Sequence, residues 1–297
     1  MLLVRWLRFF GLLLILAGCQ AQTGYPPDSG VAAAQFSIEN KGSDTMVNLA
    51  LAWAESYQKL HPEVRLSVTG GGSGTGIAAM INHTVDIANA SRQIKPEENA
   101  VAEKNGILPV EHVVARDAIA VIVNPINPVS QLTIQQISDI YSGKINNWAD
   151  VGGEDLVIVR LSRETNSGTH VHFLEQVLRL GQKDNKTLFA QDTLLLPSSE
   201  GITAEVSDNP HAIGYDGLGY ITPHVKVVAV AKDQALPLFV IPSVESVNNN
   251  SYPIARDLYM YTIGEPTGAI RDYLDWIMTP EAQGITRTLG FVPINTP

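Results

Sequence analysis

The chain has 297 residues, of which 45% are hydrophobic, so it can bury a large core and is long enough for two domains of ordinary size. Its formal net charge is -10, and no basic patch of the size that nucleic acid requires is visible, which argues against nucleic acid as a partner. A small anion is not excluded, because screening over about 8 Å at physiological salt leaves local hydrogen-bond donors to decide a buried site.

The N-terminus has the pattern of an export signal. Arg5 and Arg8 come before and at the edge of an apolar run that ends at Cys19 and is too short to cross a bilayer as a stable helix. Residues 16–19, Leu-Ala-Gly-Cys, resemble a bacterial lipobox, at which the signal is removed and the cysteine is acylated. We therefore expect a lipoprotein signal peptide at 1–18, and a lipid on Cys19 that anchors the exported protein to the membrane of the cell envelope.

The segment that follows has the composition of a tether. Residues 19–35 include two prolines, two glycines and many small side chains, and their apolar residues follow no regular period. Cys19 is the only cysteine, so the exported domain has no disulfide available. The folded part is expected to begin near Phe36.

Strand and helix patterns alternate in the first part of the folded chain. Strands are predicted at 36–40, 64–68 and 85–90. Each is followed by a polar loop, and helices are predicted from about Met46, from about Ile77 and over an acidic run at 96–104. Strands that alternate with helices imply βαβ units and a mainly parallel sheet, so the predicted fold class is α/β.

The rest of the chain continues this alternation. A β-rich run at 118–123 is expected to carry the chain out of the first sheet, and another at 254–262 to lead back to it. Between them the sequence predicts a helix at 134–141, a strand at 156–161 with a helix from about Val171, and a strand at 225–231. Helices at 267–278 and 281–288 are expected to close the chain.

Four polar loops follow the predicted strands, and three of them open a helix. Their candidate ligand-binding residues are Ser43, Asp44 and Thr45; Ser73, Gly74 and Thr75; Ser91 and Arg92; and Arg163, Ser167, Gly168 and Thr169. In an open α/β sheet such loops meet at the carboxyl ends of the strands, where helix N-termini aim unpaired N–H groups at one crevice. Helix capping explains any single loop better, but four together indicate a site for a small anion.

The fourth loop carries the most specific chemistry. Arg163 offers a planar guanidinium fork that matches an oxyanion, Gly168 lets a ligand approach the backbone, and Ser167 or Thr169 can cap the following helix. These residues predict an oxyanion clamp, although a well-capped helix start beside a surface arginine would have the same sequence.

Other kinds of site do not fit the spacing. The glycine-rich run at 70–76 has neither the ending of a nucleotide P-loop nor the register of G-x-G-x-x-G, and Ser73 misses the G-x-S-x-G nucleophile elbow. His170 and His172 are two residues apart on a predicted helix and point to different faces, so solvated positions are expected and no metal site. No cofactor is predicted.

Two further groups of residues are expected to be structural. The acidic pair Glu97 and Glu98 is typical of a solvated helix face. Helical spacing and apolar neighbours predict core positions for Trp53, Tyr57, Tyr273 and Trp276.

The segments 42–45, 72–76, 85–92, 140–148, 163–169 and 212–215 occur in an order and spacing that resemble the substrate-binding lipoproteins of bacterial phosphate ABC importers, which are type II periplasmic binding proteins. The resemblance spans about residues 36 to 295. It implies two hinged α/β lobes, residues 36–117 with 252–297 and residues 118–251, that close on the ligand. It also implies hydrogen bonds to dehydrated phosphate from Thr45, Ser73, Arg163, Ser167, Gly168 and Thr169. The implied protein is a monomer that catalyses no reaction and delivers phosphate to a membrane permease.

One departure from the family concerns selectivity. Well-known members place an Asp just after the third strand, where it accepts a hydrogen bond from the proton that phosphate carries and sulfate lacks, whereas this chain has Arg92 there. Thr165 likewise replaces an acidic partner of the clamp arginine. We hypothesise that Asp44 supplies the acceptor, with Glu164 as the next candidate, and that Arg92 adds a second cationic contact. A helix N-cap role for Asp44 is the alternative.

Three other functions stay open at this point. The site could hold another tetrahedral oxyanion such as sulfate, molybdate or tungstate, or the protein could sense phosphate without a role in transport. A serine hydrolase using Ser73 or Ser167 belongs to a different class, and it would need a nearby general base.

Overall fold

The computed structural model describes residues 36–233 and 235–294, so the predicted signal peptide, Cys19 and the tether lie outside the described residues. The strands are β1 (Phe36–Gly42), β2 (Val64–Thr69), β3 (Ile87–Ala90), β4 (Pro109–Val123), β5 (Gln131–Thr133), β6 (Val159–Arg163), β7 (Leu194–Leu196), β8 (Ala212–Gly217), β9 (Lys226–Ala231) and β10 (Ala255–Ile263). The α-helices are α1 (Val47–Leu60), α2 (Ser73–Ile81), α3 (Pro96–Lys104), α4 (Ile134–Tyr141), α5 (Gly168–Phe173), α6 (Ser199–Asp208), α7 (Val244–Asn248), α8 (Gly268–Ile277) and α9 (Pro280–Thr288). Short 3-10 helices occur at Asp44–Met46, Trp148–Val151 and Leu218–Tyr220, and α5 continues as a π-helix at Leu174–Leu178.

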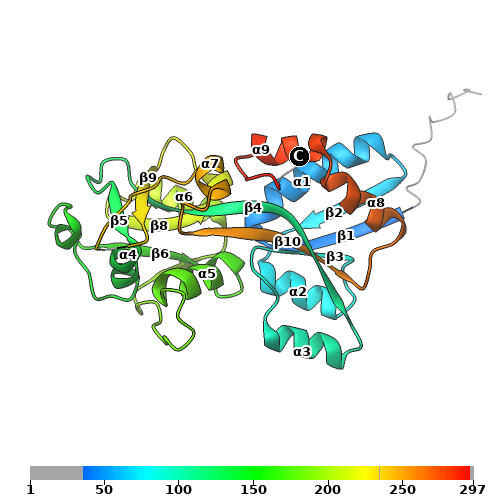
Figure 1. Cartoon of the computed structure of the whole chain (residues 1–297), viewed down its shortest axis with the longest axis horizontal. Helices are drawn as coiled ribbons and strands as arrows, with labels where there is room; N and C mark the ends of the chain where they lie inside the picture. The colour runs from blue at the N-terminus through cyan, green and yellow to red at the C-terminus, as the bar shows by residue number, and fades with distance from the viewer. Residues whose placement is uncertain (1–35, 234, 295–297) are drawn as a thin grey trace, which may run out of the picture. The chain divides into compact units, whose positions relative to one another are not determined.

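The strands form one continuous sheet in the order β2-β1-β3-β10-β4-β8-β6-β7, with β9 pairing with β4 and β5. The pairs β1 with β2, β1 with β3, β5 with β9, β6 with β7 and β6 with β8 are parallel. Every antiparallel pair includes β4 or β10, which run side by side through the middle of the sheet (Figure 1). The sheet is therefore parallel, as predicted, except around these two long strands.

Strand β4 is longer than the sequence pattern suggested. The apolar run at 118–123 was expected to form the strand, but β4 begins at Pro109 and pairs with β10 up to Ala118 before it pairs with β8. The first half is only partly buried and includes charged residues, so it lacks the continuous apolar run that identifies a buried strand.

Strand β6 begins and ends later than predicted. It runs from Val159 to Arg163 rather than over 156–161, and its arginines point into the interior. Arg160 is 1% exposed and donates hydrogen bonds to the carbonyl groups of Ile140 and Ile145, with Asp192 as its ion-pair partner at 3.0 Å. Because two of its buried residues are arginines, this strand does not stand out as an apolar run. The shift places Arg163 at the end of the strand instead of in the loop.

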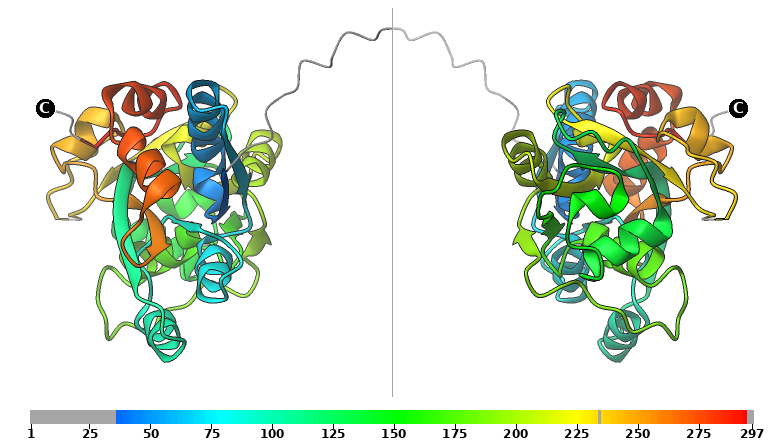
Figure 2. Two further views of the ribbon diagram at one scale, coloured as in Figure 1. Left: turned by 90° about the vertical axis from the view of Figure 1, so that its right-hand side faces the viewer. Right: turned by 90° about the vertical axis from the view of Figure 1, so that its left-hand side faces the viewer.

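Helices cover both faces of the sheet. Around β1, β2 and β3, helices α1, α8 and α9 lie on one side and α2 and α3 on the other (Figures 1 and 2). The predicted aromatic core is confirmed on the first side, where Trp53, Tyr57 and Tyr273 are buried and Trp276 packs against them. Fully burying each such ring contributes roughly 1.5–3 kcal/mol. The Trp53 Nε1–H also donates to the carbonyl of Ala282 at 2.9 Å, which ties α1 to α9.

Candidate functional site

The structure brings all four predicted loops into contact. The hydroxyl oxygens of Thr45 and Thr169, from the first and fourth loops, lie 2.7 Å apart although 124 residues separate them in the chain. The hydroxyl of Ser73 at the start of α2 accepts a hydrogen bond from the backbone N–H of Ser91 at 3.0 Å, which joins the second and third loops. All of these side chains are buried.

Gly168 is the point at which the fourth loop meets the second and third. A Cβ atom on Gly168 would clash with Ser73 Oγ, lie 2.5 Å from Ser91 Oγ and lie 3.1 Å from the Ser91 backbone carbon, so a larger residue here would force the neighbouring loops to shift. Gly168 is the first residue of α5, and its neighbour Ser167 caps that helix by accepting a hydrogen bond from the Thr169 N–H at 3.2 Å. The predicted capping role of Ser167 is thus confirmed.

Asn166 fastens the fourth loop to the second, and no sequence pattern singles it out. Its carbonyl accepts a hydrogen bond from the Gly74 N–H at 3.1 Å, and its side chain donates to the carbonyl of Gly71 at 3.0 Å. Thr75 donates to the same Gly71 carbonyl at 2.7 Å, so its hydroxyl serves the loop itself. Gly71 and Gly72 have φ values of +116° and +96°, which explains the glycine-rich run at this turn.

Arg163 is almost completely buried, with an exposed fraction of 1%. It donates hydrogen bonds through Nη1 to Ser199 Oγ at 2.7 Å and through Nη2 to the Pro197 carbonyl at 2.8 Å, and Nη2 lies 2.9 Å from Asp44 Oδ2. Its Nε is buried and has no hydrogen-bond partner among the described residues. Arg163 is therefore not a surface arginine, and one of its donors is still available.

Asp44 does not cap the helix that follows it. Its Oδ2 instead accepts a hydrogen bond from the N–H of Ser199, the first residue of α6, at 2.9 Å. A carboxylate at a helix N-terminus is favourable because the first N–H groups lack partners and carry partial positive charge. Asp44 thus caps a helix 155 residues away while it neutralises Arg163, in place of the acidic partner that Thr165 does not provide.

Arg92 lies at the site, but its charge is largely neutralised. Its Nη1 and Nη2 donate to the two oxygens of Glu98 at 2.8 and 2.6 Å, so the prediction that Glu98 is simply solvated is wrong. Burial would raise the pKa of Glu98, but the hydrogen bond and charge of Arg92 outweigh burial and lower it. Arg92 Nε is buried without a partner among the described residues, as is the hydroxyl of Ser43.

Arg256, in β10, is a site residue that the sequence reasoning missed. It donates through Nη2 to Thr169 Oγ1 at 3.0 Å and through Nη1 to the Ser91 carbonyl at 3.1 Å, so it braces two loops. Asp117 of β4 holds the guanidinium from the other side at 2.8 Å. No local motif surrounds Arg256, and only the pairing of β10 with β3 and β4 brings it here.

The two histidines of α5 are not solvated, contrary to the prediction. His170 is buried and its Nδ1 lies 3.1 Å from Ser162 Oγ, while the Nε2 of His172 is buried. Burial lowers the pKa of His170 to about 4 and that of His172 to about 3, so both are neutral at pH 7. Among the described residues, no group of three or more histidine, cysteine or carboxylate side chains could hold a metal ion.

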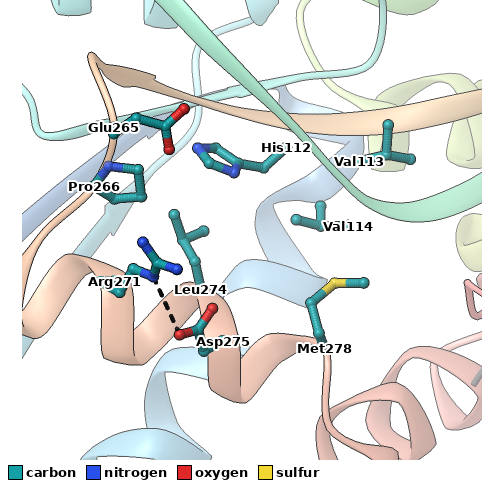
Figure 3. A pocket seen from close by; sticks show the side chains of 9 residues that line it. All are labelled: His112, Val113, Val114, Glu265, Pro266, Arg271, Leu274, Asp275 and Met278. Carbon is teal, nitrogen blue, oxygen red and sulfur yellow. Dashed lines mark hydrogen bonds and ion pairs between the residues drawn. The ribbon is translucent and has the colours of Figure 1, made fainter.

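Two cavities differ in their relation to the four loops. One of about 570 Å³ is lined by Arg92, Arg256 and His172 and thus reaches the edge of the site. Another of about 340 Å³ lies between β4 and α8, where Glu265 points toward His112 and Arg271 pairs with Asp275 (Figure 3). None of the loop residues lines the second cavity, so it is unrelated to the anion chemistry described above.

Comparisons with known proteins agree with this geometry. A model of the PBP superfamily domain matches residues 27–281. A phosphate-binding protein PstS of Pseudomonas aeruginosa is 31% identical over 91% of this chain and 86% of its own length, and one of Bacillus subtilis is 29% identical over 98% and 94%. A putative phosphate ABC transporter substrate-binding protein from Clostridium perfringens, solved with bound phosphate, has a TM-score of 0.77 at 32% identity and covers 87% of this chain and 100% of its own.

Proposed function

This chain belongs to the PBP superfamily and, within it, to the phosphate-binding proteins PstS, and we propose that its four loops form the phosphate site. Its fold is that of a type II periplasmic binding protein. The protein binds inorganic phosphate outside the cytoplasm and passes it to an ABC importer. No helix among residues 36–233 and 235–294 is long and apolar enough to span a bilayer.

The observation that carries the site assignment is a set of buried donors without partners. Ser43 Oγ, Arg92 Nε and Arg163 Nε come from three of the four loops, and none has an acceptor among the described residues. A buried donor left unpaired costs about 1–3 kcal/mol, and a charged donor costs more. Three oxygens of a singly protonated phosphate act only as acceptors, so the anion could satisfy all three donors together with helix N–H groups.

Closure of two lobes over phosphate is part of the proposal. The division at 36–117 with 252–297 against 118–251 places the boundary inside β4 and just before β10. The contacts of Thr45 with Thr169, and of Asn166 with Gly74, would then join opposite lobes. Such contacts support closure because each would form only when the lobes come together.

Calorimetric titration of the mature chain with phosphate, arsenate, sulfate and molybdate tests the ligand. We expect saturable binding of phosphate and arsenate at one site and much weaker binding of sulfate and molybdate. Tight binding of molybdate or sulfate with no heat from phosphate would instead assign the loops to another oxyanion.

We expect the Asp44→Asn substitution to reduce the preference for phosphate over sulfate by about 10- to 100-fold. A hydrogen bond from the phosphate proton to a carboxylate contributes about 1.5–3 kcal/mol, and an amide that can also donate a hydrogen bond to sulfate loses this discrimination. Loss of the ion pair with Arg163 and of the α6 cap affects both anions alike, so the affinity ratio isolates the acceptor.

Glu164→Gln is the matched control for this ratio. Glu164 was the next candidate for the acceptor, but its side chain is exposed, so we expect native selectivity in the variant. An unchanged phosphate-to-sulfate ratio in Asp44→Asn together with a lower one in Glu164→Gln would transfer the role to Glu164.

Membrane attachment through Cys19 is also part of the proposal. We expect the native chain, expressed in a bacterial host, to sediment with membranes and the Cys19→Ser variant to move to the soluble or secreted fraction, because an acyl chain supplies most of the membrane affinity of such an anchor. Ser29→Ala, within the tether, is the control. Equal sedimentation of Cys19→Ser after a high-salt wash would contradict lipid anchoring.

We propose that the protein acts as a monomer without catalysis. The hydroxyls that a serine hydrolase would use are engaged in other contacts, since Ser73 bonds to Ser91 and Ser167 caps α5. The titration above should therefore be accompanied by no turnover of a chromogenic phosphate or carboxylate ester.

A further inference from the structure

A second carboxylate stands behind the clamp arginine. Asp216, in β8, is completely buried, and its Oδ1 accepts a hydrogen bond from Ser199 Oγ at 2.8 Å. The same Ser199 hydroxyl oxygen accepts from Arg163 Nη1 at 2.7 Å. The other carboxylate oxygen, Asp216 Oδ2, is buried and has no hydrogen-bond partner among the described residues. Ser199 thus links Arg163 to a carboxyl group of which only one oxygen accepts hydrogen bonds.

We propose that Asp216, acting through Ser199, positions Arg163 and takes up a proton when phosphate binds. This inference rests on the proposed phosphate site. Asp216 does not touch the ligand in this scheme. It balances the charge of Arg163 while the site is empty and gives up its own negative charge when the anion arrives.

The geometry around Asp216 favours such an exchange. Arg163 faces it from β6, the negative charge of Asp117 acts on it from β4, and Asp44 in the first 3-10 helix pairs with the same Arg163. Tyr220, at the end of the 3-10 helix after β8, adds a neutral hydroxyl, whose pKa burial raises further above its ordinary value. Glu98 and Asp117 already pair with the other two arginines of the site, so a phosphate anion beside Arg163 would compete with Asp44 and Asp216 for the charge of this one arginine.

The protonation state of Asp216 is balanced near neutrality. Burial raises the pKa of Asp216 to about 7, although the Arg163 charge and the hydrogen bonds from Ser199 and Gly217 lower it, and the Asp117 charge raises it further. An anion that pairs with Arg163 removes much of the attraction that holds the carboxylate charged. The pKa must then rise in the complex, and because coupling is reciprocal the complex must weaken as the pH rises through 7.

Calorimetry of phosphate binding at pH 7 in buffers of different ionisation enthalpy measures this exchange. A carboxyl group that is half protonated in the free protein and mostly protonated in the complex takes up about 0.4 proton. Phosphate also titrates near pH 7, so the quantity to compare is the difference between variants. We expect Asp216→Asn to take up about 0.4 proton fewer than the native protein and to lose less affinity between pH 6 and pH 8.

Asp192→Asn is the matched control, because Asp192 is the counter-ion of Arg160, another buried arginine of the same strand. We expect native proton uptake in this variant. Ser199→Ala should weaken phosphate binding about 10-fold through a misplaced Arg163, and Ser199→Thr, which restores the hydroxyl, should recover most of the affinity.

Infrared difference spectra of the native protein keep the inference testable if Asp216→Asn does not fold. Phosphate should convert a carboxylate band to a protonated carboxyl band, after the spectrum of phosphate itself is subtracted. Phosphate binding without that band, or proton uptake by Asp216→Asn equal to the native value, would overturn the inference and leave the phosphate site in place. Absence of phosphate binding in the native protein would instead overturn the proposed function.

Discussion

The Arg163→Ala variant should lose phosphate binding by about 10²- to 10⁴-fold. The guanidinium can give phosphate a charge-assisted hydrogen bond from its free Nε–H, which contributes about 1.5–3 kcal/mol, and no other cation in the fourth loop can replace its charge. The loss should be large also because Asp44 and Asp216 would then stand at the site without the positive charge that they share. Calorimetric titration with phosphate measures the affinity of the variant, and thermal unfolding measures its stability.

Arg160→Ala is the control that separates an effect on phosphate affinity from an effect on protein stability. Arg160 is as buried as Arg163 and lies on the same strand, but it binds the carbonyls of Ile140 and Ile145 instead of a loop of the site. We expect Arg160→Ala to lower the unfolding temperature and to leave the phosphate affinity of the folded protein near the native value. Near-native affinity in Arg163→Ala would refute the assignment of the clamp, whatever its stability.

Local sequence patterns predicted strands and helices well wherever a segment follows a single hydrophobic period. The strands that precede the first and third loops, the glycine-rich turn at α2 and the closing helices α8 and α9 all lie close to their predicted ranges. The pattern failed at β4 and β6, where charged residues interrupt the apolar run. In β6, one of the two arginines that break the pattern, Arg163, is the proposed clamp.

Long-range partners of the site could not be predicted in the same way. The sequence identified Asp44 and Arg163 separately, but their ion pair depends on how the chain folds across about 120 positions. Arg256 and Asp216 occur in strands without any motif, and each became visible only through its contact with a loop. Anion-binding residues at a helix N-terminus have a recognisable local sequence pattern. Residues that support those loops from a distant strand have no such pattern.

The Gly168→Ala variant should also bind phosphate poorly, by at least about 10-fold. Its new methyl group would clash with Ser73 Oγ, lie 2.5 Å from Ser91 Oγ and lie 3.1 Å from the backbone carbon of Ser91. The hydroxyls can rotate away, but the Ser91 backbone can move only if the third loop moves with it. The methyl group therefore keeps the fourth loop away from the second and third, and tight overpacking of this kind typically costs 1–3 kcal/mol.

Gly74→Ala is the matched control for Gly168→Ala. Gly74 is also in the first turn of a helix that opens toward the site, but a Cβ there would meet its nearest atom, the carbonyl oxygen of Asn166, at 3.5 Å, an ordinary contact. We expect phosphate affinity within about threefold of native in Gly74→Ala, and similar unfolding temperatures for both alanine variants without phosphate. Equal phosphate affinity in the two variants would mean that the loops need not meet at Gly168 for phosphate to bind, and the proposed closure would have to be abandoned.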